Sequence, residues 1–356
     1  MFTISLCMIV KNEEDSLARC LASVQDAVDE IIIVDTGSTD NTKEIAASFH
    51  AKIYNFTWIN DFAAARNFSF GQATKDYILW LDADDVLQKS DLEKLISLKK
   101  VEPFTYDSVT MNYHLSFDQD GKPTYSLRRN RLVKRENNFR WIGFVHEYLE
   151  VGGNIHHSDI AVTHHKEKQY TDRNLQIYLT KRKENHTFSP RDLYYFANEL
   201  RDNGRYEEAI AEYEQFLATK LGWVEDEINA CMKLAECHGR LKDREKQMEA
   251  LLRTLTYDTP RAEFCCQFGN MFVEKQQWLK AIYWFNLATT LTIPKQQLSP
   301  IDYASWTWMP HLQLTLCYDR IGNRKQALEH HQQAIQLNPH HPSIIFNENY
   351  FKGITP

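Results

Sequence analysis

The chain lacks the features that mark several common classes of protein. Its 356 residues contain no low-complexity tract, and with 43% hydrophobic and 25% charged residues they predict a folded chain throughout. The seven cysteines form no Cys-x-x-Cys pair, and five of them lie in segments with helical periodicity. We therefore expect reduced, packed thiols, with metal binding as the alternative. A formal net charge of -7 argues against nucleic acid as the main partner.

Long hydrophobic runs and two phosphate-binding loops are also missing. The apolar residues 1–10 are short, have no basic leader and continue into Lys11-Asn12-Glu13-Glu14, so we expect neither a signal peptide nor a membrane span. We accordingly expect a cytoplasmic protein. The same tetrapeptide stands where a dinucleotide-binding fold has Gly-x-Gly-x-x-Gly, and Gly-x-x-x-x-Gly-Lys-Ser/Thr does not occur in the sequence. These absences argue against a dehydrogenase and against a P-loop enzyme.

The first half of the chain alternates between strand-like and helix-like segments. Apolar segments at residues 4–10, 31–34 and 52–56, and a fourth that ends at Asp82, have the length of buried strands. Segments with helical periodicity, such as residues 61–73, lie between them. This alternation predicts right-handed crossovers and a mostly parallel α/β sheet covered by helices.

Polar side chains follow three of these strands. Asn12 follows the first strand, Asp35 the second, and Asp82, Asp84 and Asp85 the fourth. Ligands of parallel sheets bind beyond the carboxyl ends of the strands, and Mg²⁺ or Mn²⁺ prefers carboxylate oxygens together with substrate phosphates. We interpret this edge as a site for a nucleoside diphosphate and a metal. The alternative is a solvated turn that merely ends the strand.

Four motifs in this half resemble the family 2 glycosyltransferases of the GT-A fold. Because they occur together in the family's order and spacing, the likeness is far more specific than a single Asp-x-Asp. The motifs are Met8-Ile9-Val10-Lys11-Asn12-Glu13-Glu14, Ile33-Val34-Asp35-Thr36-Gly37-Ser38-Thr39-Asp40, Ala64-Ala65-Arg66-Asn67 and Leu81-Asp82-Ala83-Asp84-Asp85.

The resemblance implies a role for each motif in binding the donor. In the family, residues that match Val10, Asn12, Glu14 and Asp35 surround the nucleobase and ribose, and the arginine that matches Arg66 lies beside the nucleotide. What this implies here is a nucleotide-sugar site built by the loops after the strands.

The acidic motif carries the remaining part of the implied donor site. The aspartate that matches Asp82, followed by Ala83, faces the ribose, and the one that matches Asp84 binds the divalent cation, Mn²⁺ or Mg²⁺. The resemblance thus implies sugar transfer with inversion from a nucleotide sugar, either a uridine diphosphate hexose or a uridine diphosphate N-acetylhexosamine.

The general base is where this chain departs from many members of the family. Their Glu-Asp pair is missing, and residues 139–147 instead resemble a Trp-x-Gly-x-Val-His-Glu block of a subgroup joined to helical repeats. We expect Glu147 to be the base, because inversion requires a carboxylate opposite the leaving group, and His146 is the second candidate. Both residues being structural is the alternative. A late histidine completes the metal shell in many related enzymes, which implies His164 as a ligand, unless it is a plain strand-end histidine.

A basic segment precedes this block. We expect it either to form a solvated hairpin after the Asp120-Gly121 turn or to place some of its cations against a diphosphate or an anionic acceptor. Its cations are Lys122, Arg128, Arg129, Arg131, Lys134, Arg135 and Arg140, against the single acid Glu136.

Beyond residue 190 the pattern changes to pairs of helices. An apolar residue followed directly by a small residue occurs four times, and successive pairs are 38, 34 and 46 residues apart. This spacing resembles tetratricopeptide repeats with an insertion before the last repeat. Such repeats stack to bury their apolar stripes and leave a face for a partner. The recurring pairs are Phe196-Ala197, Leu234-Ala235, Phe268-Gly269 and Leu314-Thr315.

The sequence therefore predicts a GT-A domain at residues 1–170, a linker helix at 171–190, helical repeats at 191–342 and a tail at 343–356. The leading hypothesis is a metal-dependent inverting glycosyltransferase whose repeats bind a peptide, protein or cell-envelope glycan acceptor, or form a homodimer. The alternatives are an interaction protein with an inactive or nucleotide-sugar-sensing GT-A domain, and a nucleotidyltransferase, which would need a Gly-rich, Arg-bearing loop after the first strand.

Overall fold

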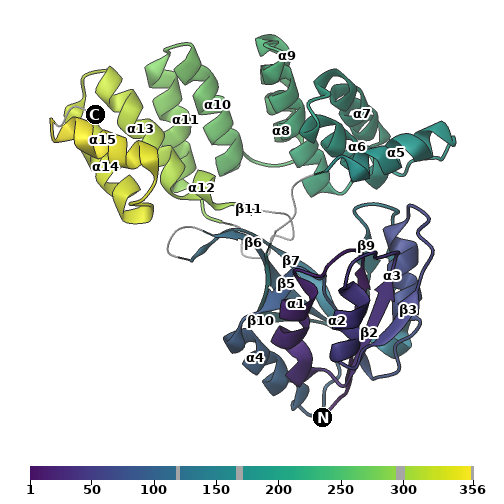
Figure 1. Cartoon of the computed structure of the whole chain (residues 1–356). Helices are drawn as coiled ribbons and strands as arrows, with labels where there is room; N and C mark the ends of the chain where they lie inside the picture. Colours follow the sequence, from purple (N-terminus) through teal and green to yellow (C-terminus); the bar gives the residue numbers. More distant parts are fainter. Residues whose placement is uncertain (118–120, 166–170, 294–300, 354–356) are drawn as a thin grey trace. The chain divides into compact units, whose positions relative to one another are not determined.

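The computed structural model describes residues 1–117, 121–165, 171–293 and 301–353, and all structural statements concern these residues. The chain divides into two compact units (Figure 1). The first comprises Met1–Phe117 and Tyr125–His186, and the second comprises Thr187–Pro356 with the short segment Asp118–Thr124.

The first unit is an α/β domain in which strands and helices alternate as far as β4. Its strands are β1 (Ile4–Val10), β2 (Glu30–Asp35), β3 (Lys52–Asn55), β4 (Tyr77–Trp80), β5 (Asp85–Leu87), β6 (Ser108–Phe117), β7 (Pro123–Lys134), β8 (Arg140–Ile142), β9 (Tyr148–Glu150) and β10 (Ile155–His164). Its helices are α1 (Leu17–Val24), α2 (Thr42–Ser48), α3 (Phe62–Phe70), α4 (Lys89–Lys99) and α5 (Arg173–Lys183).

The main sheet is mostly parallel, as the sequence predicts. Its strands follow the order β3-β2-β1-β4-β7-β6-β10-β5, and β8 pairs with β9 in a separate ribbon. Strands β3, β2, β1 and β4 run parallel, as do β6 and β10, whereas β7 runs antiparallel to β4 and β5 antiparallel to β10. In the register of β1 and β2, Val10 lies opposite Asp35. The loops that leave these two strands therefore begin at the same edge of the sheet.

Strand β1 is buried on both faces, which is typical of a central strand in a parallel sheet. Successive side chains point to opposite faces, so Leu6 and Met8 belong to one hydrophobic cluster and Cys7 to the other. The second cluster contains Trp80 and Trp141, and Trp141 joins the β8–β9 ribbon to the sheet. This packing supports the residues beside the site described below.

Some element boundaries differ from the expected ones. Strand β4 ends at Trp80 rather than at Asp82, because residues 81–84 leave the ladder and turn. Helix α3 ends at Phe70, earlier than residue 73, and Asp61 caps it by accepting a hydrogen bond from the Ala64 amide. Asp82 and Asp84 thus lie on a loop, and Asp85 begins β5.

The segments at the two expected domain junctions form helices. Helix α5 buries Leu175, Ile177 and Tyr178, and the ring of Tyr178 contacts that of Phe144 at 5.1 Å, so this helix packs onto the first unit. Helix α15 (Pro342–Phe351) occupies most of the predicted tail and buries Ile344.

The second unit is a series of antiparallel helix pairs, as the repeat pattern predicts. The four apolar-small pairs found in the sequence lie on the first helix of each pair. At Gly269 an added Cβ would approach the Phe285 ring to 2.8 Å, so the small residue permits two helices to pack closely. The pairs are α6 (Pro190–Asp202) with α7 (Tyr206–Thr219), α8 (Val224–Arg240) with α9 (Arg244–Arg253), α10 (Ala262–Glu274) with α11 (Trp278–Thr290), and α13 (Trp308–Arg320) with α14 (Arg324–Leu337).

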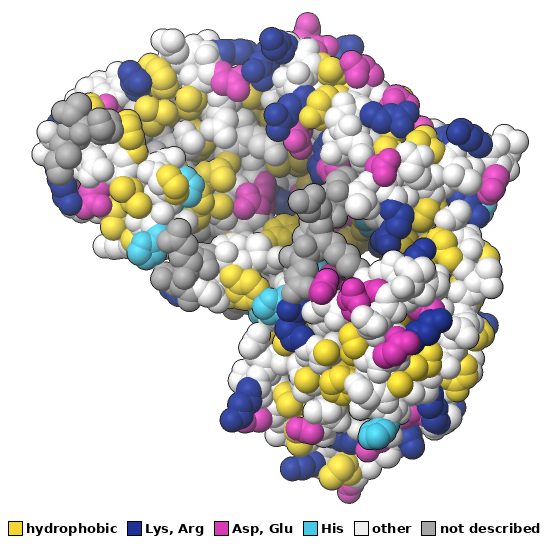
Figure 2. All heavy atoms as spheres, viewed as in Figure 1, with side chains coloured by type: hydrophobic (Ala, Val, Ile, Leu, Met, Phe, Trp, Pro, Cys, Tyr) yellow, Lys and Arg dark blue, Asp and Glu magenta, His cyan; other side chains and the backbone are white. Residues whose placement is uncertain are grey.

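The described residues bear on the predictions about the cysteines, membrane-spanning segments and charge. All seven cysteines are buried and reduced, which confirms the expectation of packed thiols. Among the described residues, no helix has both the length and the apolar character needed to cross a membrane. On the face shown in Figure 2, basic and acidic side chains are interspersed. The Asp120 position of the expected hairpin turn lies outside the described residues, and so do residues 294–300 of the insertion.

Candidate active site

The loops that follow β1 and β2 are joined to each other by polar side chains. The Asn12 amide oxygen accepts a hydrogen bond from the Thr39 backbone at 2.8 Å, and the Asn12 backbone donates to Ser38 Oγ at 3.0 Å. Glu14 Oε2 accepts from Asn41 Nδ2 at 2.8 Å. Asn12 has a φ of 54°, a left-handed conformation that asparagine tolerates better than most residues. The predicted nucleotide-binding residues Asn12 and Glu14 are exposed and held in fixed positions by the facing loop.

Asp35 and Val10 lie deeper, at the ends of their strands. The buried Asp35 carboxylate accepts hydrogen bonds from the Gly37 and Ser38 amides and lies 3.3 Å from Lys43 Nζ. Burial raises the pKa of Asp35, but these hydrogen bonds outweigh that effect and lower it overall. The Val10 carbonyl accepts from the Thr36 amide at 2.9 Å. Both residues therefore shape the loop that the sequence assigns to the nucleoside.

Arg66 on α3 connects the acidic motif to the Trp-x-Gly-x-Val-His-Glu block. Its Nη2 donates to Asp82 Oδ1 at 2.7 Å and its Nε donates to Glu147 Oε1 at 2.6 Å. The guanidinium carbon lies 5.0 Å from the Trp80 ring and 4.8 Å from the Trp141 ring. Burial lowers the pKa of Arg66, but the two carboxylates outweigh it and raise the pKa, so the guanidinium remains charged. One cation thus brings two predicted site carboxylates together.

Asn67, the next residue of α3, fixes the other end of the same block. Its side chain donates to the Trp141 carbonyl and accepts from the Trp141 amide, both at 2.9 Å. The Phe62 amide donates to the Phe144 carbonyl at 2.9 Å. Phe62, Arg66 and Asn67 of α3 therefore orient residues 141–147.

The two candidate bases differ in their surroundings. The Glu147 side chain is 11% exposed and bound to Arg66, so it lies at the edge of the acidic motif. His146 is half-buried and has a φ of 51°, an unusual conformation for histidine that allows the chain to turn before Glu147.

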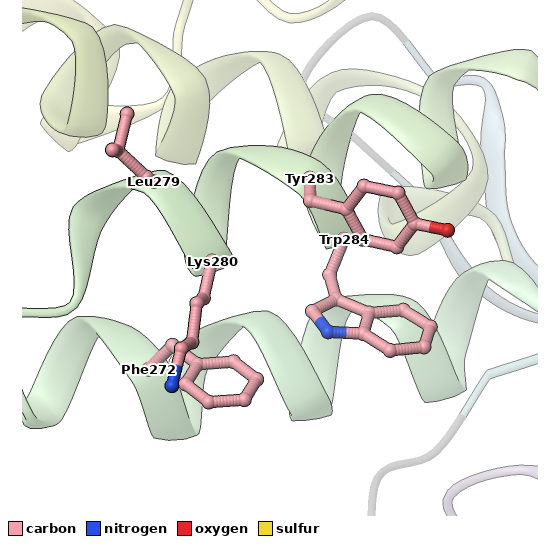
Figure 3. Close-up of a pocket in the computed structure, with 5 residues that line it drawn as sticks. All are labelled: Phe272, Leu279, Lys280, Tyr283 and Trp284. Carbon is pink, nitrogen blue, oxygen red and sulfur yellow. The ribbon is translucent and has the colours of Figure 1, made fainter.

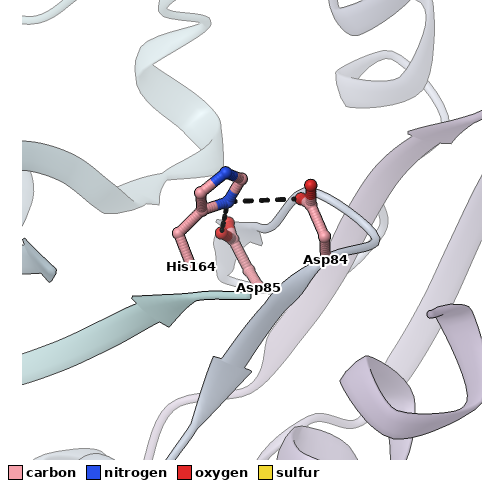
Figure 4. A group of neighbouring side chains, drawn as sticks. All are labelled: Asp84, Asp85 and His164. Carbon is pink, nitrogen blue, oxygen red and sulfur yellow. Dashed lines mark ion pairs between the residues drawn. The ribbon is translucent and has the colours of Figure 1, made fainter. Parts of the chain in front are cut away.

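The three residues most suited to a metal ion form one cluster (Figure 4). His164, at the end of β10, points its Nδ1 toward two carboxylates, 3.5 Å from Asp84 Oδ1 and 3.6 Å from Asp85 Oδ1. Ligand atoms from the three residues all lie within 4.8 Å of one another. The neighbouring carboxylates of Asp84 and Asp85 raise the pKa of His164 to about 9. The structure thus brings the predicted ligands Asp84 and His164 together, and it adds Asp85.

Asp85 is the residue of this cluster to which the sequence analysis gave no specific role. It is fully buried, and its Oδ2 lies 3.0 Å from Arg131 Nη1, a guanidinium that is also fully buried. The same Oδ2 accepts a hydrogen bond from the Asp82 amide, whereas Oδ1 has no hydrogen-bond partner among the described residues. Asp85 therefore holds the acidic loop in its turn. The sequence signal that could have placed Asp85 in the cluster is its position directly after Asp84 in the acidic motif.

Arg131 and Tyr113 were also missed as site residues. Arg131 lies over the rings of Trp80 at 3.9 Å and Tyr113 at 4.4 Å, and Tyr113 Oη lies 3.0 Å from His164 Nδ1. Burial raises the pKa of Asp82, but the charges of Arg66 and Arg131 outweigh it and lower that pKa to about 2. Arg131 was one of several cations in the basic segment, and no sequence signal pointed to Tyr113. Ala83, which lies between Asp82 and Asp84 in the sequence, is buried.

A second candidate surface lies on the helical unit (Figure 3). A pocket lined by Phe272 of α10 and Leu279, Lys280, Tyr283 and Trp284 of α11 opens between these helices. Leu279 is 72% exposed and Tyr283 65% exposed, and together they form an exposed apolar patch on α11. The side chains of this pocket are therefore available to contact another molecule.

Comparisons with known proteins identify the first unit. Residues 5–155 match the model of glycosyl transferase family 2. A TPR repeat-containing protein of Synechococcus elongatus is 40% identical over 151 residues, which are 42% of this chain and 36% of that protein. The SPbeta prophage-derived glycosyltransferase SunS of Bacillus subtilis is 30% identical over 225 residues, 58% of this chain and 51% of that protein. The chain thus spans between about a third and a half of the length of these curated relatives.

Solved structures resemble parts of the chain. Glucosyl-3-phosphoglycerate synthase from Mycobacterium tuberculosis, in complex with Mn²⁺ and UDP-glucose, has a TM-score of 0.36 at 15% identity and covers 53% of this chain and 81% of its own. YrrB, a TPR protein with an unusual peptide-binding site, has a TM-score of 0.37 at 18% identity and covers 50% of this chain and 83% of its own. Residues 5–155 thus form a domain that matches glycosyl transferase family 2, and the helix pairs of the second unit resemble tetratricopeptide repeats.

Proposed function

We propose that this protein is a metal-dependent, inverting glycosyltransferase. Its donor would be a nucleotide sugar, a uridine diphosphate hexose or N-acetylhexosamine, and its acceptor a peptide, protein or cell-envelope glycan. The proposal extends the family assignment of residues 5–155 to a reaction and to named residues. The relative SunS is itself described as a glycosyltransferase.

One observation carries the proposal: the acidic loop contributes one carboxylate to an arginine and a second carboxylate to the metal cluster. Asp82 at its start is bound to Arg66, and Asp84 near its end lies beside His164. A carboxylate near the ribose and a second one at a metal are what a nucleotide-sugar site needs, since a hard cation takes oxygen ligands from carboxylates and substrate phosphates. The presence of Arg66, Asp82 and Asp84 together argues against an inactive domain.

The cluster of Asp84, Asp85 and His164 fits a divalent cation. It offers carboxylate oxygens and an imidazole nitrogen, and the buried Asp85 Oδ1 has no hydrogen-bond partner among the described residues. A buried carboxylate oxygen without a partner costs free energy that a cation would recover. When bound, Mn²⁺ or Mg²⁺ would neutralise charge on the departing diphosphate.

The chain's own residues would perform the remaining tasks. Val10, Asn12, Glu14 and Asp35 shape the loops proposed to hold the nucleoside. Arg66 keeps Asp82 and Glu147 in fixed positions by binding both. That arrangement leaves Glu147, or failing it His146, to accept the proton of the acceptor while the sugar inverts.

Donor binding can be tested by thermal unfolding. The protein is mixed with UDP-glucose, UDP-galactose, UDP-N-acetylglucosamine or UDP-N-acetylgalactosamine, with and without Mn²⁺. A sugar nucleotide at about 100 times its dissociation constant should stabilise the fold by roughly 2.7 kcal/mol, and only when Mn²⁺ is present. Absence of a shift with any nucleotide sugar would leave the repeats as the active part, as an interaction protein. Release of pyrophosphate from a nucleoside triphosphate would instead indicate a nucleotidyltransferase.

We assign acceptor binding to the repeats, on the strength of the exposed pocket between α10 and α11. Changing Leu279 and Tyr283 together to Ser should lower sugar incorporation into protein and glycan fractions of a cell extract while donor hydrolysis stays unchanged. Leu221→Ser, which alters a 77% exposed leucine on a loop, is the matched control. A second copy of the chain is the competing occupant. A change of sedimentation coefficient in the double variant, with incorporation intact, would favour that homodimer.

A further inference from the structure

The arginines beside the acidic loop differ in what they bind. Arg66 contacts the Trp80 ring, Arg131 contacts both the Trp80 and Tyr113 rings, and Arg129 contacts Tyr113, with its guanidinium carbon 5.5 Å from the ring centre. Arg129 and Arg131 are two residues apart on β7, so their side chains leave the strand on the same face. The three cations therefore follow one another along a row of aromatic rings.

Two of these cations are already neutralised by carboxylates. Arg66 binds Asp82 and Glu147, and the buried Arg131 binds Asp85. Arg129 has no hydrogen bond or ion pair within the described part of the chain, and its Nε is buried without a partner. A guanidinium held at a ring face with its donors unused is expected to bind an anion.

The position of Arg129 indicates which anion. Tyr113 lies under Arg129 on one side and reaches His164 with its hydroxyl on the other, at 3.0 Å from Nδ1. Arg129 is thus one aromatic side chain away from the proposed metal cluster. Because a divalent cation there would share its ligand shell with the donor's phosphates, the anion within reach of Arg129 is the phosphate that the metal holds.

We propose that Arg129 binds the diphosphate of the nucleotide sugar and of the nucleoside diphosphate product. This inference rests on the proposed function, because it assumes that a nucleoside diphosphate occupies the site. The planar guanidinium would donate to phosphate oxygens not taken by the cation and would hold the negative charge that develops on the leaving group. The neighbouring Arg128 faces away, toward Thr110 Oγ1 and the Ser158 carbonyl, and has no such role.

The test is calorimetric titration of the full chain with UDP in the presence of Mn²⁺, together with Mn²⁺ binding alone followed by water proton relaxation. Arg129→Met should weaken UDP binding about 10- to 100-fold, the size of a lost hydrogen bond to a charged group, and leave Mn²⁺ affinity and the unfolding temperature unchanged. Arg129→Lys should retain part of the affinity, since it keeps the charge but not the planar fork. Arg135→Met, at an exposed cation bound to the Lys75 carbonyl, is the control and should bind UDP as the natural chain does.

Three outcomes would overturn the inference. UDP affinity of Arg129→Met within about two-fold of the natural chain would show that the cation faces something else, such as an anionic acceptor. If Arg129→Met and Arg129→Lys both bound Mn²⁺ more weakly and unfolded at a lower temperature, Arg129 would be a structural residue. If the natural chain binds neither UDP, GDP nor dTDP with Mn²⁺, the proposed function fails as well, and that result is distinct from the first two.

Discussion

At the scale of single residues, Glu147 offers a clean test because glutamine can replace its hydrogen bond. Its Oε1 accepts from Arg66 Nε, and an amide oxygen in the same place can do so too, without being able to take up a proton. Glu147→Gln should therefore lower turnover by about 10²–10⁴, the usual contribution of a general base, with an unchanged unfolding temperature.

The control for this prediction is Glu150→Gln, an exposed carboxylate on β9 of the same ribbon. Steady-state kinetics and thermal unfolding are measured on both variants. A thiol acceptor would reduce the effect, because thiolate is partly present near neutral pH. Normal turnover in Glu147→Gln, or a loss explained by unfolding alone, would assign the base to His146 or elsewhere.

The pKa of His164 makes metal binding dependent on pH. The nearby carboxylates of Asp84 and Asp85 raise this pKa from 6.5 to about 9. A group whose pKa rises on folding stabilises the fold fully below pH 6.5, and this contribution is lost as the pH rises through about 9. Mn²⁺ must displace the same proton, so its affinity should increase between pH 7 and 9.

Calorimetry in two buffers with different ionisation enthalpies measures that proton. Binding of Mn²⁺ at pH 7.5 should release close to one proton from the natural chain, and His164→Asn should release almost none. If the natural chain released no proton, His164 would not be a ligand.

At the scale of elements, the packing of α10 against α11 depends on Gly269. A Cβ there would meet the fully buried Phe285 ring at 2.8 Å, and the ring has no room to move. Gly269→Ala should thus destabilise the fold by about 1–3 kcal/mol, although alanine is the better helix former. Urea unfolding measures the change.

Gly239 on α8 is the matched control for this substitution. An added Cβ there would also come within 2.8 Å of an atom, but that atom is the flexible end of Gln247. Gly239→Ala should be neutral or stabilise by up to about 1 kcal/mol. Equal effects of the two substitutions would mean that close approach at Gly269 does not limit the packing.

The elements that the sequence could predict are those with a local signal. The parallel strands follow from short apolar runs, and the helix pairs follow from apolar-small pairs that recur along the second half. Helix α5 could not be assigned to the first unit, because its packing depends on Phe144, 34 residues before Tyr178 in the sequence. The same limit applies to the pair of Asp85 and Arg131, whose contact is created by the antiparallel strand β7.

The acids of the candidate site and Arg66 could be predicted from the sequence, but the cations of β7 could not. The motifs indicate Asp82, Asp84 and Arg66, the resemblance implies His164, and the structure places Asp84 beside His164. Which of the basic residues would face the acidic loop depends on the register of β7. A shift of one residue would turn Arg129 and Arg131 to the opposite face.

At the scale of the whole molecule, a domain that matches glycosyl transferase family 2 precedes a helical unit to which we assign acceptor binding. We propose above all that the cluster of Asp84, Asp85 and His164 makes donor turnover dependent on a divalent cation. The Asp84 side chain is 27% exposed and lies on a loop, so replacing it leaves the hydrophobic clusters untouched.

The most direct test uses the UDP-sugar that raises the unfolding temperature of the natural chain. The rate of UDP release from this donor is measured for the natural chain and for Asp84→Asn, each with Mn²⁺ and with excess chelator. We expect steady release by the natural chain with Mn²⁺, loss of that release on chelation, and the same loss in Asp84→Asn at an unchanged unfolding temperature. Release by Asp84→Asn at the rate of the natural chain, or release that persists when the metal is removed, would show that this cluster does not hold a metal needed for turnover.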